Sequence, residues 1–355
     1  MALSTMLSPA QRIGKLKGEI LKHAIPREVL GMIGETKPMP KNVGDTVIFR
    51  RWLPINATVA SPNTFFTDGT GDRGNALAQE FLSSEGVTPN AETLVPQDIT
   101  VSLNEYSVLF GYTKRTADLY EDDVPGAMKM QTGERLSLVR EMVRFGVIKT
   151  CTNKFYGGTG TSRATVNGKL SLKLLRKITK ALDIQHTDKV TQILSPSPKY
   201  GTTGVEAGYF VFIHTDLKPD VRDLPGFVPT SKYGTMKTVS PYEFGSIEEF
   251  RIIASPELVS VQDSGAAVGA LGLESTSGTN IDTYQVVVAG RDAWGDVALR
   301  GVKALEVYDL KPGQIDKNDP TGQRGYVGAS CYFASVLLNQ LHMAVAEVGA
   351  SELTD

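Results

Sequence analysis

The last quarter of the chain, Thr283 to Val345, restricts the possible folds more than any other stretch. Two runs rich in β-branched and aromatic residues, Val302 to Leu310 and Gly325 to Val336, flank a polar interval, Lys311 to Arg324. That interval combines proline, glycine, aspartate and asparagine, the residues that favour turns. The pattern predicts two antiparallel strands joined by a long, charged loop.

Shorter runs predict further strands. Tyr284 to Ala289 and Tyr209 to His214 are continuous apolar runs of the kind found in buried strands, and Gly245 to Ser255 predicts one more strand. Gly44 to Pro54 is rich in β-branched and aromatic residues and is bounded by glycine and proline. Its expected partner is Asp98 to Thr113, where apolar and polar residues alternate at the start.

The strongest helix signal covers Val124 to Thr152. Asp122 or Asp123 can cap it, and Pro125 suits its first turn. Apolar residues recur at spacings of three and four and define the expected buried face, which consists of Leu136, Val139, Val143 and Val147, widened by Leu138, Met142 and Phe145. The solvent-facing remainder is then expected to hold Arg135, Arg140, Arg144 and Lys149.

A second amphipathic helix is expected to begin after Ser171, which can cap it. The residues that are expected to face inward are Leu174, Leu175, Ile178 and Leu182, and those that are expected to face outward are Lys173, Arg176, Lys177 and Lys180. The basic side has no interleaved aromatic residues on which bases could stack, so a solvated face is favoured over a nucleic-acid interface.

About forty polar residues separate the first two strands, a length that is unusual inside a compact domain unless the loop is functional. The loop contains Gly69, Gly71 and Gly74 in a G-x-G-x-x-G spacing, but no buried strand precedes it and no βαβ unit follows. Asp68 and Asp72 lack the later glutamate of a calcium loop. Neither a nucleotide site nor a metal site is therefore expected here.

Composition excludes several other classes. The 355 residues are 41% hydrophobic with a formal net charge of −2, so the chain can bury a core and is not marked as a nucleic-acid binder by its bulk charge. Cys151 and Cys331 sit in apolar surroundings without metal-ligand spacing and are expected to be buried thiols. His214 and Asp216 lie two apart, but no nucleophile can be placed beside them. No catalytic residue and no cofactor is predicted.

The N-terminal segment, Met1 to Asn42, carries seven positive and three negative residues, an excess of +4. Its basic residues include Arg12, Lys15, Lys17 and Lys22. Glycine and proline interrupt its helical pattern, so two interpretations remain: a terminal helix docked on its own domain, or an arm that lies on a neighbouring subunit or faces an enclosed polyanion. No run is long enough to span a membrane and no signal peptide is visible, which indicates cytosolic synthesis.

Two strings near the C-terminus carry a family resemblance. AGRDAWGDVALRG followed by PGQIDKNDPTGQRGYVG resembles the tailed-phage major capsid proteins of the Hong Kong 97-type fold, in particular the N-four-like coat protein family. The similarity is dense over about a fifth of the chain and is looser back to Gly44. Thr321 departs from the family, which often has leucine at that position.

The resemblance implies an α+β fold with five parts. These are an N-terminal arm (1–43), the E-loop and its base strands (44–113), a P-domain with a long spine helix (114–188), an A-domain (189–295), and a return to the P-domain that carries a long hairpin, whose tip is the P-loop, and the C-terminal segment (296–355).

The implied function is that of a structural shell subunit that forms pentamers and hexamers around a phage genome, in a virion assembled in the host cytoplasm. Portal, scaffolding or decoration proteins and packaged double-stranded DNA are the implied partners, and no membrane is involved. The implied inter-subunit contacts are Phe65, Phe66, Leu77, Phe81 and Leu82 in the E-loop and Asp316, Lys317, Asp319 and Arg324 in the P-loop. An encapsulin nanocompartment is the alternative, and a nucleotide-binding enzyme is a remote one.

Overall fold

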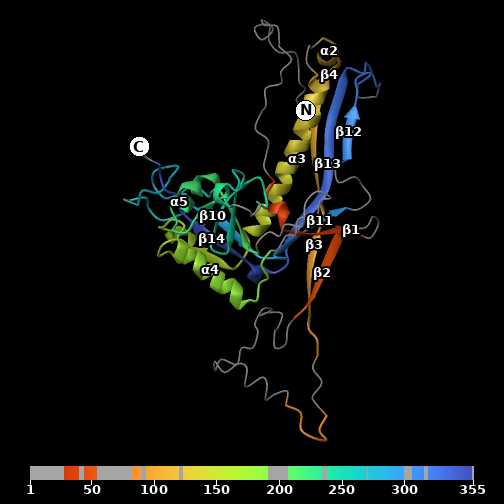
Figure 1. Ribbon diagram of the computed structural model, residues 1–355. Coiled ribbons are helices and arrows are strands. Elements are labelled where there is room, and N and C mark those ends of the chain that lie inside the picture. Colours follow the sequence, from red (N-terminus) through yellow and green to blue (C-terminus); the bar gives the residue numbers. More distant parts are fainter. Residues whose placement is uncertain are drawn as a thin grey trace, which may run out of the picture.

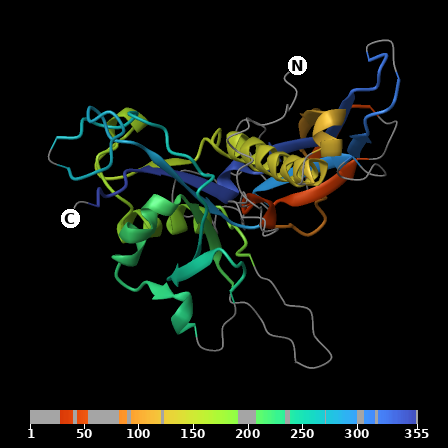
Figure 2. The same cartoon turned by 90° about the horizontal axis from the view of Figure 1, so that it is seen from above.

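A computed structural model describes residues 28–39, 44–53, 82–88, 93–119, 123–190, 207–233, 238–269, 271–299, 306–315 and 319–353. An elongated part, built on one long helix and one long strand, stands beside a compact part built on a second sheet (Figure 1). The view from above shows the compact part to one side of the long helix (Figure 2). The basic residues Arg12, Lys15, Lys17 and Lys22 lie outside the described residues.

The elongated part contains a five-stranded sheet centred on β13 (Arg324–Leu337). One side of β13 pairs with β12 (Glu306–Leu310) and then with β11 (Trp294–Leu299), and the other side pairs with β4 (Asn104–Thr113), all antiparallel. β1 (Glu35–Met39) adds to β11 in parallel. Glu306 faces Ser330 and Leu310 faces Tyr326, so the long hairpin predicted from the sequence is confirmed.

Helix α3 (Val124–Ile148) lies along one face of this sheet. Its N-cap is Asp123, whose side chain accepts a hydrogen bond from the Gly126 N–H at 3.1 Å. At about 1.5 Å per residue the helix is roughly 40 Å long. Below it, small clusters join the helix to the strands, among them Leu136 with Ala329 and Cys331. Both cysteines of the chain are buried and free, as expected.

The predicted inward face of α3 is partly wrong. Leu136 and Phe145 are buried, whereas Met142 is exposed and Val139, Val143, Val147 and Leu138 are only half-buried. The helix buries Glu141 and Arg144 instead, although Arg144 was expected to face solvent. The physical reason is a network of charges under the helix, which hydrophobic periodicity cannot reveal.

The compact part contains a seven-stranded sheet. Its strands in spatial order are β5 (Lys154–Tyr156), β14 (Met343–Val348), β10 (Tyr284–Ala289), β6 (Tyr209–Ile213), β9 (Phe250–Ala254), β8 (Glu243–Ile247) and β7 (Val228–Pro229). Every residue of β6, β9, β10 and β14 is buried, because both faces of the sheet are covered.

One face of this sheet packs against α4 (Leu172–Ile184) and α5 (Lys218–Arg222). The four apolar residues predicted to face inward on α4 are all buried there, and the Ser171 hydroxyl caps the helix through the Leu174 N–H at 3.2 Å. The opposite face packs against the end of α3, Trp294, and residues 29 and 30. The second core therefore joins the two parts of the molecule.

Two predicted strands are each divided into two in the structure. Gly245 to Ser255 is not one strand, because Glu248 adopts a positive φ of 49° and turns the chain between β8 and β9. Asp98 to Thr113 falls into two strands, since β3 (Pro96–Ser102) pairs with β2 (Thr46–Trp52) and β4 pairs with β13. The side chain of His214 caps the short 3-10 helix that follows β6.

The remaining described elements are short. They are α2 (Lys114–Leu119) and the 3-10 turns η2 (Leu30–Met32), η3 (Arg163–Thr165), η4 (Thr215–Leu217), η5 (Thr230–Lys232) and η6 (Gln340–His342). The segment between β9 and β10 folds back on itself through bridges such as Val261 to Thr283. Among the described helices, none has the length and apolar character required to cross a bilayer.

Candidate assembly surfaces

One face of the long sheet is covered by α3 and the other is open. Residues that lie directly opposite each other on paired strands share a face, so Tyr308, Gly328 and Leu109 form one row across β12, β13 and β4. The neighbouring Asp309 points the other way and reaches Lys129 of α3 at 2.5 Å. The open face therefore carries Leu109, Tyr308 and Leu310, which are 52%, 48% and 44% exposed.

Hydrogen bonds hold the hydroxyl groups of the tyrosines on this face. The Tyr308 hydroxyl lies 3.0 Å from Ser330 Oγ and donates to Glu306 at 2.9 Å, and Tyr332 donates to Glu105 at 3.1 Å. Gly328 has no room for a side chain, because a Cβ would lie 2.8 Å from the carbonyl oxygen of Val108. The result is an aromatic and aliphatic surface whose tyrosine hydroxyls are hydrogen-bonded, a character shared with surfaces that bind other proteins.

Strand β12 also presents a free backbone edge in the described part of the sheet, because it pairs only with β13. Four of its five residues are exposed, including Val307. An exposed apolar edge strand is a template for pairing with another chain unless something covers it. This edge and the open face lie on the same end of the elongated part.

The hairpin tip is braced from within. Gly313 N–H donates to Gly322 O at 2.8 Å, and both glycines have positive φ. Asp319 accepts from the Arg324 N–H at 2.7 Å, and hydrogen bonds from the Gln323 and Arg324 backbones lower the pKa of its carboxyl group. Asp319 is thus engaged within its own turn, whereas the Arg324 side chain is exposed. Asp316 and Lys317 lie outside the described residues.

The ribbon of β2 and β3 is the base of the long predicted loop. One face packs Phe49 against Val297 and Met39, while Ile48 and Trp52 project from the other face, Trp52 with 59% exposure. Leu53 N–H still pairs with Val95 O at 3.0 Å, so the chain leaves and returns on adjacent strands. Leu82 is 77% exposed, and the other predicted contacts (Phe65, Phe66, Leu77 and Phe81) lie outside the described residues.

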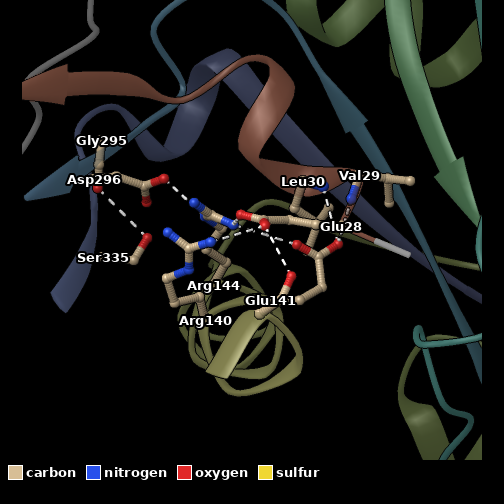
Figure 3. A network of polar contacts seen from close by, with 10 residues as sticks. Glu28, Val29, Leu30, Arg140, Glu141, Arg144, Gly295, Asp296 and Ser335 are labelled. Atoms are coloured by element: carbon tan, nitrogen blue, oxygen red, sulfur yellow. Dashed lines mark hydrogen bonds and ion pairs between the residues drawn. The ribbon is translucent and has the colours of Figure 1, made fainter. Parts of the chain in front are cut away.

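A buried polar network anchors residues 28–34 to the junction of the two parts (Figure 3). Arg144 binds Glu28 and also donates from Nε to Asp296 of β11 at 2.7 Å. Glu28 also accepts from Arg140 at 3.3 Å and from Ser137 at 3.1 Å. Burial opposes the charge on Arg144, but Asp296 and Glu28 outweigh burial and raise the pKa of the guanidinium.

Glycines let the segment approach this network closely. A Cβ on Gly31 would lie 3.0 Å from the Arg144 guanidinium, and one on Gly34 would lie 2.9 Å from Nε1 of Trp294. Leu30 and Val29 are fully buried in the second core. Sequence reasoning missed this site, because its buried charges come from three distant segments that share no motif.

The other residue groups singled out in the sequence, His214 with Asp216 and the basic face of α4, make ordinary structural contacts. His214 and Asp216 do meet, with Nδ1 and Oδ2 2.9 Å apart, but Asp216 is also bound by the Tyr284 hydroxyl at 2.9 Å. Within the described ranges, no three acidic, histidine or cysteine side chains gather as metal ligands. On the basic face of α4, Arg176 is paired with Glu248.

No family model matches the chain. The major capsid protein of Pseudomonas phage KPP21 is 20% identical over 337 residues, which cover 85% of this chain and 84% of that protein. The capsid of Ralstonia phage GP4 has a TM-score of 0.66 at 13% identity, with 99% and 100% of the two chains covered.

The capsid of cyanophage Pam1 has a TM-score of 0.59 at 13% identity, with 98% and 99% covered. The head of Helicobacter pylori bacteriophage KHP40 has a TM-score of 0.59 at 11% identity, with 98% of each chain covered. The resemblance to phage capsid proteins predicted from the sequence is therefore confirmed, as is the mixed helix and strand content. The chain has the fold of tailed-phage capsid subunits over nearly its whole length.

Proposed function

We propose that this chain is the major capsid subunit of a tailed phage and that it assembles with copies of itself into an icosahedral shell. The observation that carries this proposal is the open apolar face of the long sheet, on a subunit whose fold matches phage capsid subunits from end to end. A monomer of this shape leaves that face and a free strand edge in water. A second copy can cover both.

The covering segment is, in this proposal, the long loop of a neighbouring copy, the E-loop. Residues 54–92 leave and return through the β2–β3 ribbon, and their apolar members (Phe65, Phe66, Leu77, Phe81 and Leu82) are too few and too dispersed along the loop to anchor it on their own core. The open face is at the other end of the elongated part (Figure 1). Such a head-to-tail contact generates closed rings when the rotation closes.

The proposed division into domains follows the two sheets. The five-stranded sheet with α3 as spine helix forms the P-domain, and the seven-stranded sheet forms the A-domain, expected at the centre of each capsomer. The boundaries differ from those drawn on the sequence, because β5 and α4 pack with the A-domain sheet although residues 114–188 were assigned to the P-domain. Strand β14 also belongs to this sheet, although residues 296–355 were expected to return to the P-domain.

Other contacts are proposals of the same kind. The P-loop residues Asp316, Lys317 and Arg324 would form charge pairs with neighbouring tips, whereas Asp319 is engaged in its own turn. The basic N-terminal residues would face packaged DNA by non-specific contact. Portal, scaffolding or decoration proteins would complete a virion assembled in the host cytoplasm. Catalysis is no part of this proposal.

Loop excision tests the proposal most directly. Replacing residues 56–92 with Asn-Gly joins the ribbon strands by a tight turn, and closure entropy changes only slowly with loop length. The shortened protein should fold cooperatively, with a melting temperature within several degrees of the parent, but should remain as monomers or free capsomers. Light scattering and electron micrographs of both proteins, purified at high concentration, give the readout.

The parent should form closed shells or rings of five or six under the same conditions. A sharp monomer mass for the parent across concentrations and salts would refute the shell function itself. Complete shells from the shortened protein would instead refute only the E-loop assignment. Unfolding of the shortened protein would show that the loop belongs to the core of its own subunit.

A further inference from the structure

The network under α3 holds more negative than positive charge. The described charged side chains that α3, the N-terminal segment and β11 present to one another here are Arg140, Glu141, Arg144, Glu28 and Asp296. Two arginines thus face three carboxylates. β13 contributes only the hydroxyl of Ser335 and the ring of Phe333, over which the Arg144 guanidinium lies at 5.0 Å.

Both arginines are committed to the other two acids. Arg144 is hydrogen-bonded to Glu28 and Asp296, and Arg140 binds Glu28. Glu141 approaches the Arg144 guanidinium only to 3.5 Å, and its Oε2 has no hydrogen-bond partner in the described part of the chain. Glu141 is therefore the surplus carboxylate, and only 1% of the residue is exposed.

The other oxygen of Glu141 holds the N-terminal segment in place. Oε1 accepts from the N–H groups of Val29 and Leu30, each at 3.0 Å. These donors lie at the start of η2, where no backbone acceptor is available. A proton on Oε2 would remove the surplus buried charge and leave Oε1 free to accept both bonds, so the protonated form suits this site better than the ionised form.

We propose that Glu141 is the proton-binding member of a latch that fastens residues 28–34 to α3, and that loss of its proton loosens this segment. The latch acts on the first residues of the described fold, which the network holds against α3 and β11. It is a property of the single subunit and does not rest on the proposed shell function.

The direction of the pH dependence follows from the carboxyl groups. Burial raises the pKa of Glu141, and burial likewise raises the pKa of Asp296. An acid whose pKa is raised by docking stabilises the docked form below its ordinary pKa, and this contribution is lost as the pH rises through the raised value. The latch should therefore loosen from the mildly acidic range toward neutral pH and above.

Glu28 sets the lower limit of the pH range in which the segment is docked. Burial alone would raise its pKa, but the hydrogen bond and charge of Arg144, with the charge of Arg140, outweigh burial and lower it. The contribution of Glu28 is present above its ordinary pKa and is lost as the pH falls through the lowered value. Docking should thus be tightest at a pH close to the ordinary pKa of aspartate and glutamate side chains.

Hydrogen exchange tests the latch in the full-length protein. Protection of residues 28–34, corrected for the intrinsic exchange rate, should fall by about tenfold or more between about pH 5 and pH 8 in the parent. In Glu141→Gln the amide oxygen still accepts from Val29 and Leu30, but no charge can form. Its protection should change less than that of the parent over the same range, because Asp296 is then the remaining acid of the network whose pKa burial raises.

A fluorescence titration provides a second readout. Trp294 is fully buried, and Gly34 lies against its indole nitrogen. With the exposed Trp52 changed to Phe, Trp294 is the sole tryptophan. Its emission should titrate in the parent background and titrate with a smaller amplitude with Glu141→Gln, while Glu352→Gln, which removes an exposed carboxylate, should leave the titration intact. A flat parent, or an unchanged titration in Glu141→Gln, would overturn the latch.

Discussion

The two sheets of this protein bury their residues in different ways. In the seven-stranded sheet, helices or core segments cover both faces, and four strands are buried at every position. In the five-stranded sheet, α3 covers one face and the opposite face leaves Leu109, Tyr308 and Leu310 exposed. The compact part covers both faces of its own sheet, whereas the elongated part leaves one face of its sheet available to a neighbour.

This difference separates residues that fold the subunit from residues that join subunits. A large side chain in the compact part stabilises the fold through the hydrophobic effect and close packing. An exposed side chain on the open face contributes little to folding, because its environment is similar in the folded and unfolded chain. Its contribution should appear when a second copy covers it.

The largest effect is expected in the compact core. Phe212 is fully buried and contacts the Trp294 ring edge-on, with centroids 6.2 Å apart. Phe212→Ala leaves a cavity at the junction of the two parts and should lower the free energy of unfolding by about 3–5 kcal/mol. Leu136→Ala, in the small cluster under α3, should lower the free energy of unfolding by about 2–3 kcal/mol, at the lower end of the range for buried leucine-to-alanine substitutions.

Urea unfolding of the unassembled subunit measures both changes. Phe212→Leu is the matched control, because it keeps most of the apolar volume and should recover most of the loss. If Leu136→Ala were the more damaging substitution, the elongated part would be the true stability core, and the contrast between the two sheets would be reversed.

The middle effect concerns the helix caps, one in each part. Ser171 caps α4 through the Leu174 N–H, and Asp123 caps α3 through the Gly126 N–H. Changing either residue to alanine leaves that donor without its side-chain acceptor and should cost about 1 kcal/mol. Ser171→Ala should shift the unfolding of the whole compact part, whereas Asp123→Ala should mainly increase hydrogen exchange in the first turn of α3. Ser171→Asp, which can still cap, should restore stability.

The sequence predicts the apolar elements better than the polar ones. In α4 the cap and the apolar spacing agree with the observed burial, because hydrophobic contact alone decides which side faces in. In α3 the same argument placed Arg144 in solvent, yet it is buried among acids that come from residues far apart in the chain. Pairing between distant charges has no local signature, so periodicity could not find it.

Turns and exposed surfaces show the same limit. The break between β8 and β9 depends on a positive φ at Glu248, a residue with no turn preference, so one strand was predicted instead of two. The alternation at the start of Asp98 to Thr113 is visible in the sequence, but which face of β4 and β13 stays open depends on where α3 lies. The strings at the C-terminus predicted the capsid resemblance, which the relatives confirm, whereas the site residues named in the loops remain predictions.

The smallest effect on folding, and the one that distinguishes the two sheets most sharply, is expected at Leu109. Leu109 and Val259 are each 52% exposed, one on the open face and the other in the loop beside the compact part. Substituting either by glutamine should change the free energy of unfolding by no more than about 0.5 kcal/mol.

On the proposed assembly, Leu109→Gln places an amide under the neighbouring subunit, and an imperfectly paired amide weakens association. Light scattering should then show a higher concentration threshold for shells with Leu109→Gln and an unchanged threshold with Val259→Gln. Equal thresholds for the two variants would mean that the open face is not an assembly surface, and the contact between copies would have to be sought on the β12 edge or at the hairpin tip.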